Sequence, residues 1–215
     1  MKAMKPTRII IFAKAPVAGY AKTRLIPALG AEGASRLARR MLAHTVGNAL
    51  RANLGPVELC AAPSTADPAW RELALPPELQ WSEQGEGDLG ARMARAALRG
   101  LDAGLQVLLI GTDCPALDSD VLRAAASALN DHDAAITPTA DGGYALLGLN
   151  HFHASLFDDM RWSVSTVADE TLERMGHIGW RVARLPAQHD IDEPLDLQWL
   201  PAGWLPSVIE ALPTN

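Results

Sequence analysis

The sequence has two cysteines, few aromatic residues, no excess of positive charge and no long apolar run. Cys60 and Cys114 lack the spacing of metal ligands, and free buried thiols are the usual state of such residues in a reducing compartment. We therefore predict no disulfide bond. No apolar run approaches the roughly 18 residues that a membrane-spanning helix needs, and the short stretch at residues 9–13 is not a secretory signal. The expected protein has no membrane span and is cytoplasmic.

The charge balance excludes a further class of partner. The chain carries 19 basic and 25 acidic residues, for a net charge of -6. A nucleic-acid-binding protein would be expected to carry a clustered basic face, so we predict no nucleic-acid partner. Small anionic substrates stay compatible with this charge, because they need only a few local cations and backbone amides.

The apolar content and its pattern predict an α/β fold. The chain has 215 residues, of which 48% are hydrophobic, and we expect a single domain over residues 1–215. Short apolar runs alternate with helical patterns, as in a mostly parallel sheet that helices cover on both faces. The expected strands are residues 8–13, 57–61, 79–82, 107–110, 134–137, 144–149 and 180–185. The expected helices are residues 31–53, 68–75, 88–103, 119–130 and part of 164–175.

The loop after the first predicted strand has the composition of a phosphate site. In open α/β sheets, ligands bind outside the carboxyl ends of the strands. The loop AKAPVAGYAKTRL contains Gly19, Lys22 and Arg24, and backbone amides together with a mobile ammonium can face phosphoryl oxygens. It matches neither the Walker motif nor the dinucleotide motif GxGxxG. An ordinary loop with solvated lysines is the alternative, and in both cases we expect Lys22 to be exposed.

Two acidic segments predict a site for a hard cation. Asp113 follows the apolar run at residues 107–110, and Asp190 and Asp192 flank Ile191 in HDIDEPLDL. In an extended segment both flanking carboxylates would turn to one side while Ile191 packs inward. Mg²⁺ or Mn²⁺ takes one or two protein carboxylates and completes its shell with water and phosphate oxygens. Turn chemistry at Asp113 and a solvated turn that caps a helix near Pro194 are the alternatives.

Three further features bear on the ligand. The paired glycines of TADGGY, after Asp141, allow the backbone to approach a ligand closely, although they also suit a hairpin turn between two strands. Asp88 in GDLG has the sequence context of a helix N-cap, and that helix N-terminus could face the ligand. Trp162 could stack on a base or sugar ring, or anchor a helix start. Cys114 is expected to pack in the interior, since nothing nearby supplies a base.

Five motifs together resemble a known family. IFAKAPVAGYAKTRL, QGEGDLGARM, GTDCPAL, TADGGYALLGL and WSVSTV resemble the bacterial family of uncharacterised, glycosyltransferase-like proteins that is sometimes associated with arsenosugar biosynthesis. The resemblance runs from about Arg8 to Leu197. More distantly, the chain is similar to the 2-phospholactate and molybdenum-cofactor guanylyltransferases. The resemblance implies the GT-A fold of the nucleotide-diphospho-sugar transferases.

The resemblance also implies roles for single residues. Lys22 matches the lysine that neutralises nucleotide phosphates, Asp113 matches the metal-binding acid after the central strand, and Asp192 matches the second metal-side residue. Asp190 is the less favoured match for that last position. The first loop departs from the pattern LAAGxGxRM of the sugar-nucleotide pyrophosphorylases, so the resemblance does not define the base or the number of phosphates.

The prediction is a transferase that uses a nucleotide-activated donor, a small-molecule acceptor and Mg²⁺ or Mn²⁺. The family favours glycosyl transfer from a nucleotide-sugar, whereas the lysine-bearing loop favours nucleotidyl transfer with release of pyrophosphate. A non-catalytic nucleotide-binding protein is the third hypothesis. The predicted catalytic residues are Lys22, Arg24 and Asp113, and the predicted metal ligands are Asp113 and Asp192. The predicted donor-binding residues are Ala13, Gly19, Lys22, Asp88, Asp141, Gly142, Gly143 and Trp162.

Overall fold

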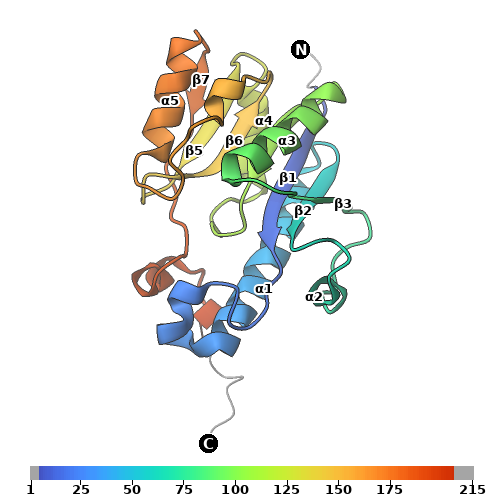
Figure 1. Cartoon of the computed structure of the whole chain (residues 1–215), viewed down its shortest axis with the longest axis vertical. Coiled ribbons are helices and arrows are strands. Elements are labelled where there is room, and N and C mark those ends of the chain that lie inside the picture. Colours follow the sequence, from blue (N-terminus) through green and yellow to red (C-terminus); the bar gives the residue numbers. More distant parts are fainter. Residues whose placement is uncertain (1–4, 206–215) are drawn as a thin grey trace, which may run out of the picture.

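The described strands form one twisted, mostly parallel sheet. The computed structural model describes residues 5–205, and within them seven strands pair in the order β3-β2-β1-β4-β6-β5-β7 (Figure 1). β6 is antiparallel to its neighbours β4 and β5, and the other pairs are parallel. The predicted α/β class is confirmed. The strands are β1 (Thr7–Lys14), β2 (Val57–Ala62), β3 (Gln80–Glu83), β4 (Gln106–Ile110), β5 (Ala134–Pro138), β6 (Tyr144–Leu149) and β7 (Val182–Arg184).

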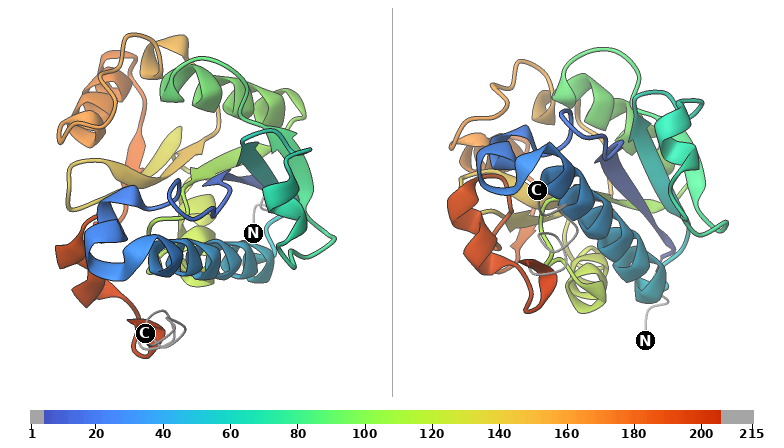
Figure 2. Two further views of the ribbon diagram at one scale, coloured as in Figure 1. Left: turned by 60° about the horizontal axis from the view of Figure 1, so that its bottom comes forward. Right: turned by 90° about the horizontal axis from the view of Figure 1, so that it is seen from below.

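Helices cover both faces of the sheet, as predicted (Figures 1 and 2). The α-helices are α1 (Ile26–Ala52), α2 (Pro68–Arg71), α3 (Leu89–Asp102), α4 (Ser119–Ala128) and α5 (Val167–His177). Short 3-10 helices lie at η1 (Thr23–Leu25), η2 (Ala154–Leu156) and η3 (Pro194–Trp199). Ile9 and Ile11 of β1 pack with α1 and α4, whereas Ile10 packs with α3 on the other face. The uninterrupted apolar run of β1 is thus explained, because side chains on both faces of this strand are buried.

Some boundaries differ from the prediction. α1 begins at Ile26 rather than near residue 31, and Gly30 (φ 67°, ψ 167°) interrupts it as a kink. The helical pattern was predicted only beyond this glycine, whose backbone conformation suits a residue without a Cβ. α2 ends at Arg71, well before the predicted end at residue 75. Within residues 5–205, no helix is both long and apolar enough to cross a bilayer.

The chain after β7 returns along the sheet to the first loop. Figure 2 shows this red segment beside the blue start of α1. Ile191 and Trp204 share a buried apolar cluster with Leu25, Leu37 and Met41 from the N-terminal part of the chain. Burial of these side chains favours the docking of the segment, because removal of apolar surface from water is the dominant stabilising contribution in folding. Residues 190–192 are thereby held near the carboxyl ends of β1 and β4.

Candidate active site

Lys22 lies inward, at the turn that connects β1 to α1. Its backbone has the left-handed conformation (φ 50°, ψ 45°) and forms the N-cap of η1. Only 8% of its side chain is exposed, so our expectation of an exposed lysine was wrong. The chain after β7 docks over this loop and covers Lys22. This docking depends on tertiary contacts, so the loop sequence alone did not predict it. A non-glycine residue in this conformation costs of order 1–3 kcal/mol and persists where surrounding contacts hold it.

The Lys22 ammonium has three oxygen partners. Its Nζ lies 2.6 Å from Asp113 Oδ1, 2.8 Å from Asp192 Oδ1 and 2.6 Å from the carbonyl oxygen of Ile191. Burial by itself would lower the pKa of Lys22, but the charges of the two carboxylates outweigh it and the pKa is raised. The lysine is therefore cationic, and the three side chains together carry a net charge of about -1. We call this group the lysine-aspartate cluster.

Backbone contacts bring the two aspartates together. Asp113 follows β4, and its carbonyl oxygen accepts a hydrogen bond of 2.8 Å from the backbone N-H of Ile191. Ile191 is fully buried, so the prediction that it packs inward is confirmed. Asp192, the next residue, then reaches Lys22. The carboxylates of Asp113 and Asp192 keep 48% and 38% of their side-chain surface exposed, so the cluster can be approached from outside.

A cavity of about 150 Å³ adjoins the cluster. Asp113, Asp141 and Asp190 contribute carboxylates to its wall. Burial, and then the charge of Asp141, raise the pKa of Asp190 to about 6. Burial also raises the pKa of Cys114 to about 11, so this residue is a thiol, consistent with the predicted packing role. The remaining wall is formed by Gly111, Cys114, Thr139, Gly143, Tyr144 and Ala145.

The TADGGY segment is the connection of a β-hairpin. β5 and β6 are antiparallel neighbours, and Thr139 and Gly143 pair at the turn through a backbone hydrogen bond of 2.9 Å. Gly142 has φ +91°, and a Cβ at this position would lie 1.9 Å from the carbonyl oxygen of Ser165. The hairpin alternative is therefore confirmed, and the close approach that requires Gly142 is made to the chain before α5. Gly143 lines the cavity, and the side chain of Asp141 accepts a hydrogen bond from its backbone N-H.

The QGEGD loop is fixed beside the end of β1. Gln84 is buried, and its side-chain amide donates to the carbonyl oxygens of Ala13 and Cys60. The predicted N-cap is confirmed, because the Asp88 carboxylate accepts a hydrogen bond of 2.8 Å from the N-H of Ala91. Our sequence interpretation missed Gln84. Its position before two glycines and a helix cap is the local signal, since a polar residue that anchors a turn fits that context.

Gly19, Arg24 and Trp162 are not among the described partners of the Lys22 ammonium. Gly19 and Arg24 are exposed on the first loop. The Trp162 indole packs against the start of α3, because a Cβ on Gly90 would meet its Nε1 at 2.9 Å. That nitrogen is buried and has no hydrogen-bond partner among the described residues. The indole therefore packs at a helix start, as in one of the two alternatives for Trp162, although the helix concerned is α3.

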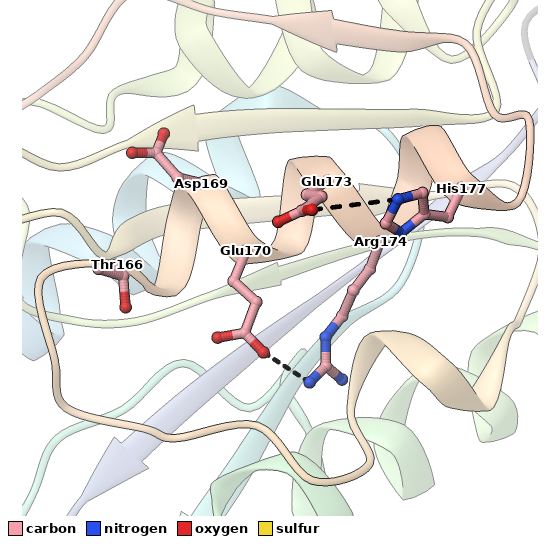
Figure 3. A pocket seen from close by; sticks show the side chains of 6 residues that line it. All are labelled: Thr166, Asp169, Glu170, Glu173, Arg174 and His177. Carbon is pink, nitrogen blue, oxygen red and sulfur yellow. Dashed lines mark hydrogen bonds and ion pairs between the residues drawn. The ribbon is translucent and has the colours of Figure 1, made fainter.

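A larger hollow of about 550 Å³ lies along α5 (Figure 3). Its wall comes from Thr166 and successive turns of that helix. Arg174 pairs with Glu170 at 2.6 Å, and His177 approaches Glu173 at 4.0 Å. These are i,i+4 pairs of a helix surface, which are common and weak. No residue of the lysine-aspartate cluster lines this hollow, so it is not the candidate active site.

Asp113 and Asp192 form an acidic pair that has the chemistry of a site for a small cation. Among residues 5–205, no three or more His, Cys, Asp and Glu side chains form a group that could hold a metal ion. Asp113 and Asp192 nevertheless converge on one positive charge, the ammonium of Lys22. Mg²⁺ is commonly bound through one or two carboxylates, with water and substrate phosphates as further ligands. The pair therefore fits a divalent cation that arrives with phosphates.

Comparison with known proteins identifies the family. Residues 45–164 match the model of the family described as uncharacterized proteins conserved in bacteria, DUF2064. The chain belongs to the DUF2064 family. The matched range contains Asp113 and the cavity residues of the β5–β6 turn, but not Lys22 or Asp192. No curated protein matches the chain in sequence.

A solved structure similar to this DUF2064 protein is the "putative nucleotide-diphospho-sugar transferase" from Desulfovibrio desulfuricans G20. The two are 33% identical, with a TM-score of 0.84 over 90% of this chain and 85% of that one. A cytidylyltransferase from Leptospira borgpetersenii is 14% identical, with a TM-score of 0.60 over 98% and 99% of the two chains. Rv0371c from Mycobacterium tuberculosis H37Rv, solved as a manganese complex, is 16% identical, with a TM-score of 0.52 over 97% and 100%. The predicted nucleotide-diphospho-sugar transferase fold is confirmed.

Proposed function

We propose that this DUF2064 protein is a transferase that uses a nucleotide-activated donor, and that it transfers a glycosyl group from a nucleotide-diphospho-sugar. The observation that carries the proposal is the convergence of Lys22, Asp113 and Asp192 at the carboxyl ends of β1 and β4, where α/β sheets bind ligands. The relative that is 33% identical, described as a "putative nucleotide-diphospho-sugar transferase", supports it. Residues 1–215 act as one domain in this proposal.

The chain's own residues have the following roles in the proposed reaction. Asp113 and Asp192 would hold Mg²⁺ or Mn²⁺, which would supply positive charge to the donor phosphates. Lys22 stabilises the charge that builds on the leaving nucleoside diphosphate as the bond between the sugar carbon and the phosphate oxygen breaks. An acceptor hydroxyl forms the new bond, and its proton passes to a carboxylate of the cavity. Positioning and electrostatics provide the rate enhancement, without a covalent nucleophile.

The cavity beside the cluster favours glycosyl transfer over transfer to a phosphorylated acceptor. Its volume of about 150 Å³ is smaller than the 300–1,000 Å³ of most ligand pockets, so it would hold one part of an acceptor. Asp113, Asp141 and Asp190 line it. Asp141 and Asp190, which are not assigned to the metal, repel a phosphate group and accept hydrogen bonds from hydroxyl groups. We propose that a hydroxyl-bearing part of the acceptor enters there.

Nucleotidyl transfer is the second candidate. The cytidylyltransferase from Leptospira borgpetersenii shares the fold, and Lys22 would suit a triphosphate donor as well as a diphosphate donor. In this reaction the acceptor attacks a phosphorus atom and pyrophosphate leaves. A non-catalytic nucleotide-binding protein is the third hypothesis, and the association of the family with arsenosugar biosynthesis stays a prediction.

Product analysis separates these functions. The purified protein is incubated with Mn²⁺, a panel of nucleotide-sugars and nucleoside triphosphates, and pooled small-molecule acceptors. Release of nucleoside diphosphate that depends on acceptor is expected for glycosyl transfer. Release of pyrophosphate would overturn glycosyl transfer in favour of nucleotidyl transfer. Saturable donor binding without either product would support the third hypothesis, a non-catalytic nucleotide-binding protein. A variant with Asp113→Asn is the control for contaminating enzymes, because any activity that it retains in full does not come from this site.

A further inference from the structure

In this structure the ammonium of Lys22 lies at the position where a cation shared by Asp113 and Asp192 would be expected. An ammonium group has three N-H donors. Three oxygen atoms of the chain lie within 2.8 Å of Nζ, on Asp113, Asp192 and Ile191. Ile191 and Asp192 accept hydrogen bonds from the ammonium, and Asp113 is its ion-pair partner. These contacts hold Nζ at the two acids, so Lys22 can turn to a donor phosphate only if it gives up at least one of these partners.

The charges lead to the same requirement. With Lys22 held by the two aspartates, the cluster carries a net charge of about -1, which repels the phosphates of a donor. A divalent cation on the two aspartates would bring the net charge of the pair to zero and leave the charge of Lys22 available. The carboxylates are 48% and 38% exposed, whereas the lysine side chain is 8% exposed. The acids are thus accessible to an incoming cation while the lysine is covered.

We propose that Lys22 is an internal counter-ion that competes with the divalent cation for Asp113 and Asp192, and that it turns to the donor phosphates when the cation replaces it. The proposal rests on the metal site of the proposed function. It makes the cation and the phosphates partners in one exchange: the carboxylates lose the ammonium and gain the cation, and the ammonium gains phosphate oxygens. The resting site should accordingly bind a complex of a divalent cation with a phosphate more tightly than it binds either one alone.

The first test measures Mn²⁺ binding without any nucleotide, by electron paramagnetic resonance titration of free Mn²⁺. Lys22→Met removes the charge and keeps most of the length of the side chain, which is 8% exposed. Removal of the competitor should tighten Mn²⁺ binding about tenfold, within the usual range of coupling between two sites. Lys14→Met is the matched control, because Lys14 is an exposed lysine at the end of β1. It should leave Mn²⁺ binding near that of the wild type.

The outcomes separate the inference from the proposed function. If Lys22→Met binds Mn²⁺ as the wild type does, or more weakly, the competition is wrong although the metal site stands. If Asp113→Asn keeps full Mn²⁺ binding, the metal site of the proposed function is wrong, and the inference falls with it. Lys22→Gln repeats the test if the methionine variant does not fold, because its amide can donate to the carboxylates without a charge. Circular dichroism establishes folding for each variant.

The second test uses inorganic pyrophosphate without metal, followed by isothermal titration calorimetry. Asp113→Asn should release Lys22 in part and tighten metal-free pyrophosphate binding, although the same variant should weaken Mn²⁺ binding. Asp102→Asn at the exposed end of α3 is the control for the loss of one negative charge. In the Lys22→Met background, Asp113→Asn should have a much smaller effect, since coupled residues depart from additivity. An equal effect in both backgrounds would overturn the role of Lys22.

Discussion

Two clusters of three charged side chains lie at opposite ends of the sheet, and their compositions are inverse. At the amino ends of β1 and β2, the carboxylate of Glu58 pairs with Arg8 at 3.0 Å and with Arg99. At the carboxyl ends, one lysine pairs with two aspartates. The first cluster has one acid between two bases, and the second has one base between two acids.

The exposure of the acids distinguishes the two clusters. Glu58 is 3% exposed and also accepts a hydrogen bond of 2.6 Å from Ser82. The partners of this carboxylate are groups of the protein itself. The cluster can therefore stabilise the fold, but its carboxylate is not available to a ligand from outside. Asp113 and Asp192 keep much of their surface exposed, although the lysine between them is buried. Charged groups that are partly satisfied and open to solvent are the ones available to a ligand, which is why we assign function to the second cluster.

The largest effect is expected on turnover. Lys22→Met should lower kcat on the order of 100- to 1,000-fold, because it removes a fixed positive charge from the leaving phosphates. Glu58→Gln should keep near-normal turnover in the protein that remains folded, since its cluster lies at the other end of the sheet. Steady-state kinetics on the donor found by product analysis measures both. Equal losses in the two variants would erase the functional distinction between the clusters.

The next effect is expected on the stability of the fold. Glu58→Ala should lower the free energy of unfolding by about 3 kcal/mol, because it removes the buried partner of two arginines, Arg8 (15% exposed) and Arg99 (35% exposed). Glu78→Ala at an exposed position is the control and should change it by less than about 0.5 kcal/mol. Urea denaturation is the measurement. A loss as small as that of the control would show that the Glu58 cluster contributes little.

A third prediction concerns stabilisation by ligand. Mn²⁺ plus nucleotide at a hundredfold excess over the dissociation constant should stabilise the wild type by about 2.7 kcal/mol and raise its Tm. Asp113→Asn and Asp192→Asn should each lose most of this gain, and the double variant should be little worse than either, because both act through one ion. Thermal denaturation with and without ligand provides the readout. Survival of the full increment in a single variant would remove that residue from the metal site.

The smallest effect is a difference in acid stability. Burial alone would raise the pKa of Glu58, but hydrogen bonds from Arg99 and Ser82 and the charges of Arg99 and Arg8 outweigh it, so its pKa is lowered from 4.5. A lowered pKa means that Glu58 stabilises the fold above pH 4.5 and that this contribution is lost as the pH falls through the lowered value. Glu58→Gln should flatten this part of the stability curve. The prediction fails if unfolding at pH 3 to 6 follows the same curve in both proteins.

Local patterns predicted the fold well. Ile9, Ile10 and Ile11 form an uninterrupted apolar run that fits a strand buried on both faces, and Asp88 has the sequence context of a cap that it does form. The start of α1 was missed because Gly30 divides it. The hydrophobic periodicity of a helix or strand repeats every few residues, so it can be recognised directly in the sequence.

The candidate site was predictable in its members but not in its contacts. Lys22, Asp113 and Asp192 were selected from three separate loops, and the structure brings them together. From the sequence we predicted that the lysine contacts phosphate and that the aspartates bind a metal ion. In the structure, the lysine and the aspartates contact each other. Two features decide this contact, namely the backbone hydrogen bond between Ile191 and Asp113 and the burial of Ile191. Both depend on docking between distant segments, which no local pattern encodes.

The separation of the cluster along the chain has a consequence for biosynthesis. Lys22 and Asp192 are 170 residues apart. At synthesis rates of 5–20 residues per second, roughly 10 to 30 s pass between the addition of the lysine and that of its second acidic partner. In the later part of that interval a nascent chain contains β1 and β4 but not the segment that covers Lys22. Ribosome-bound intermediates should therefore present an uncovered lysine, and the complete cluster can form only after Asp192 has left the ribosome tunnel.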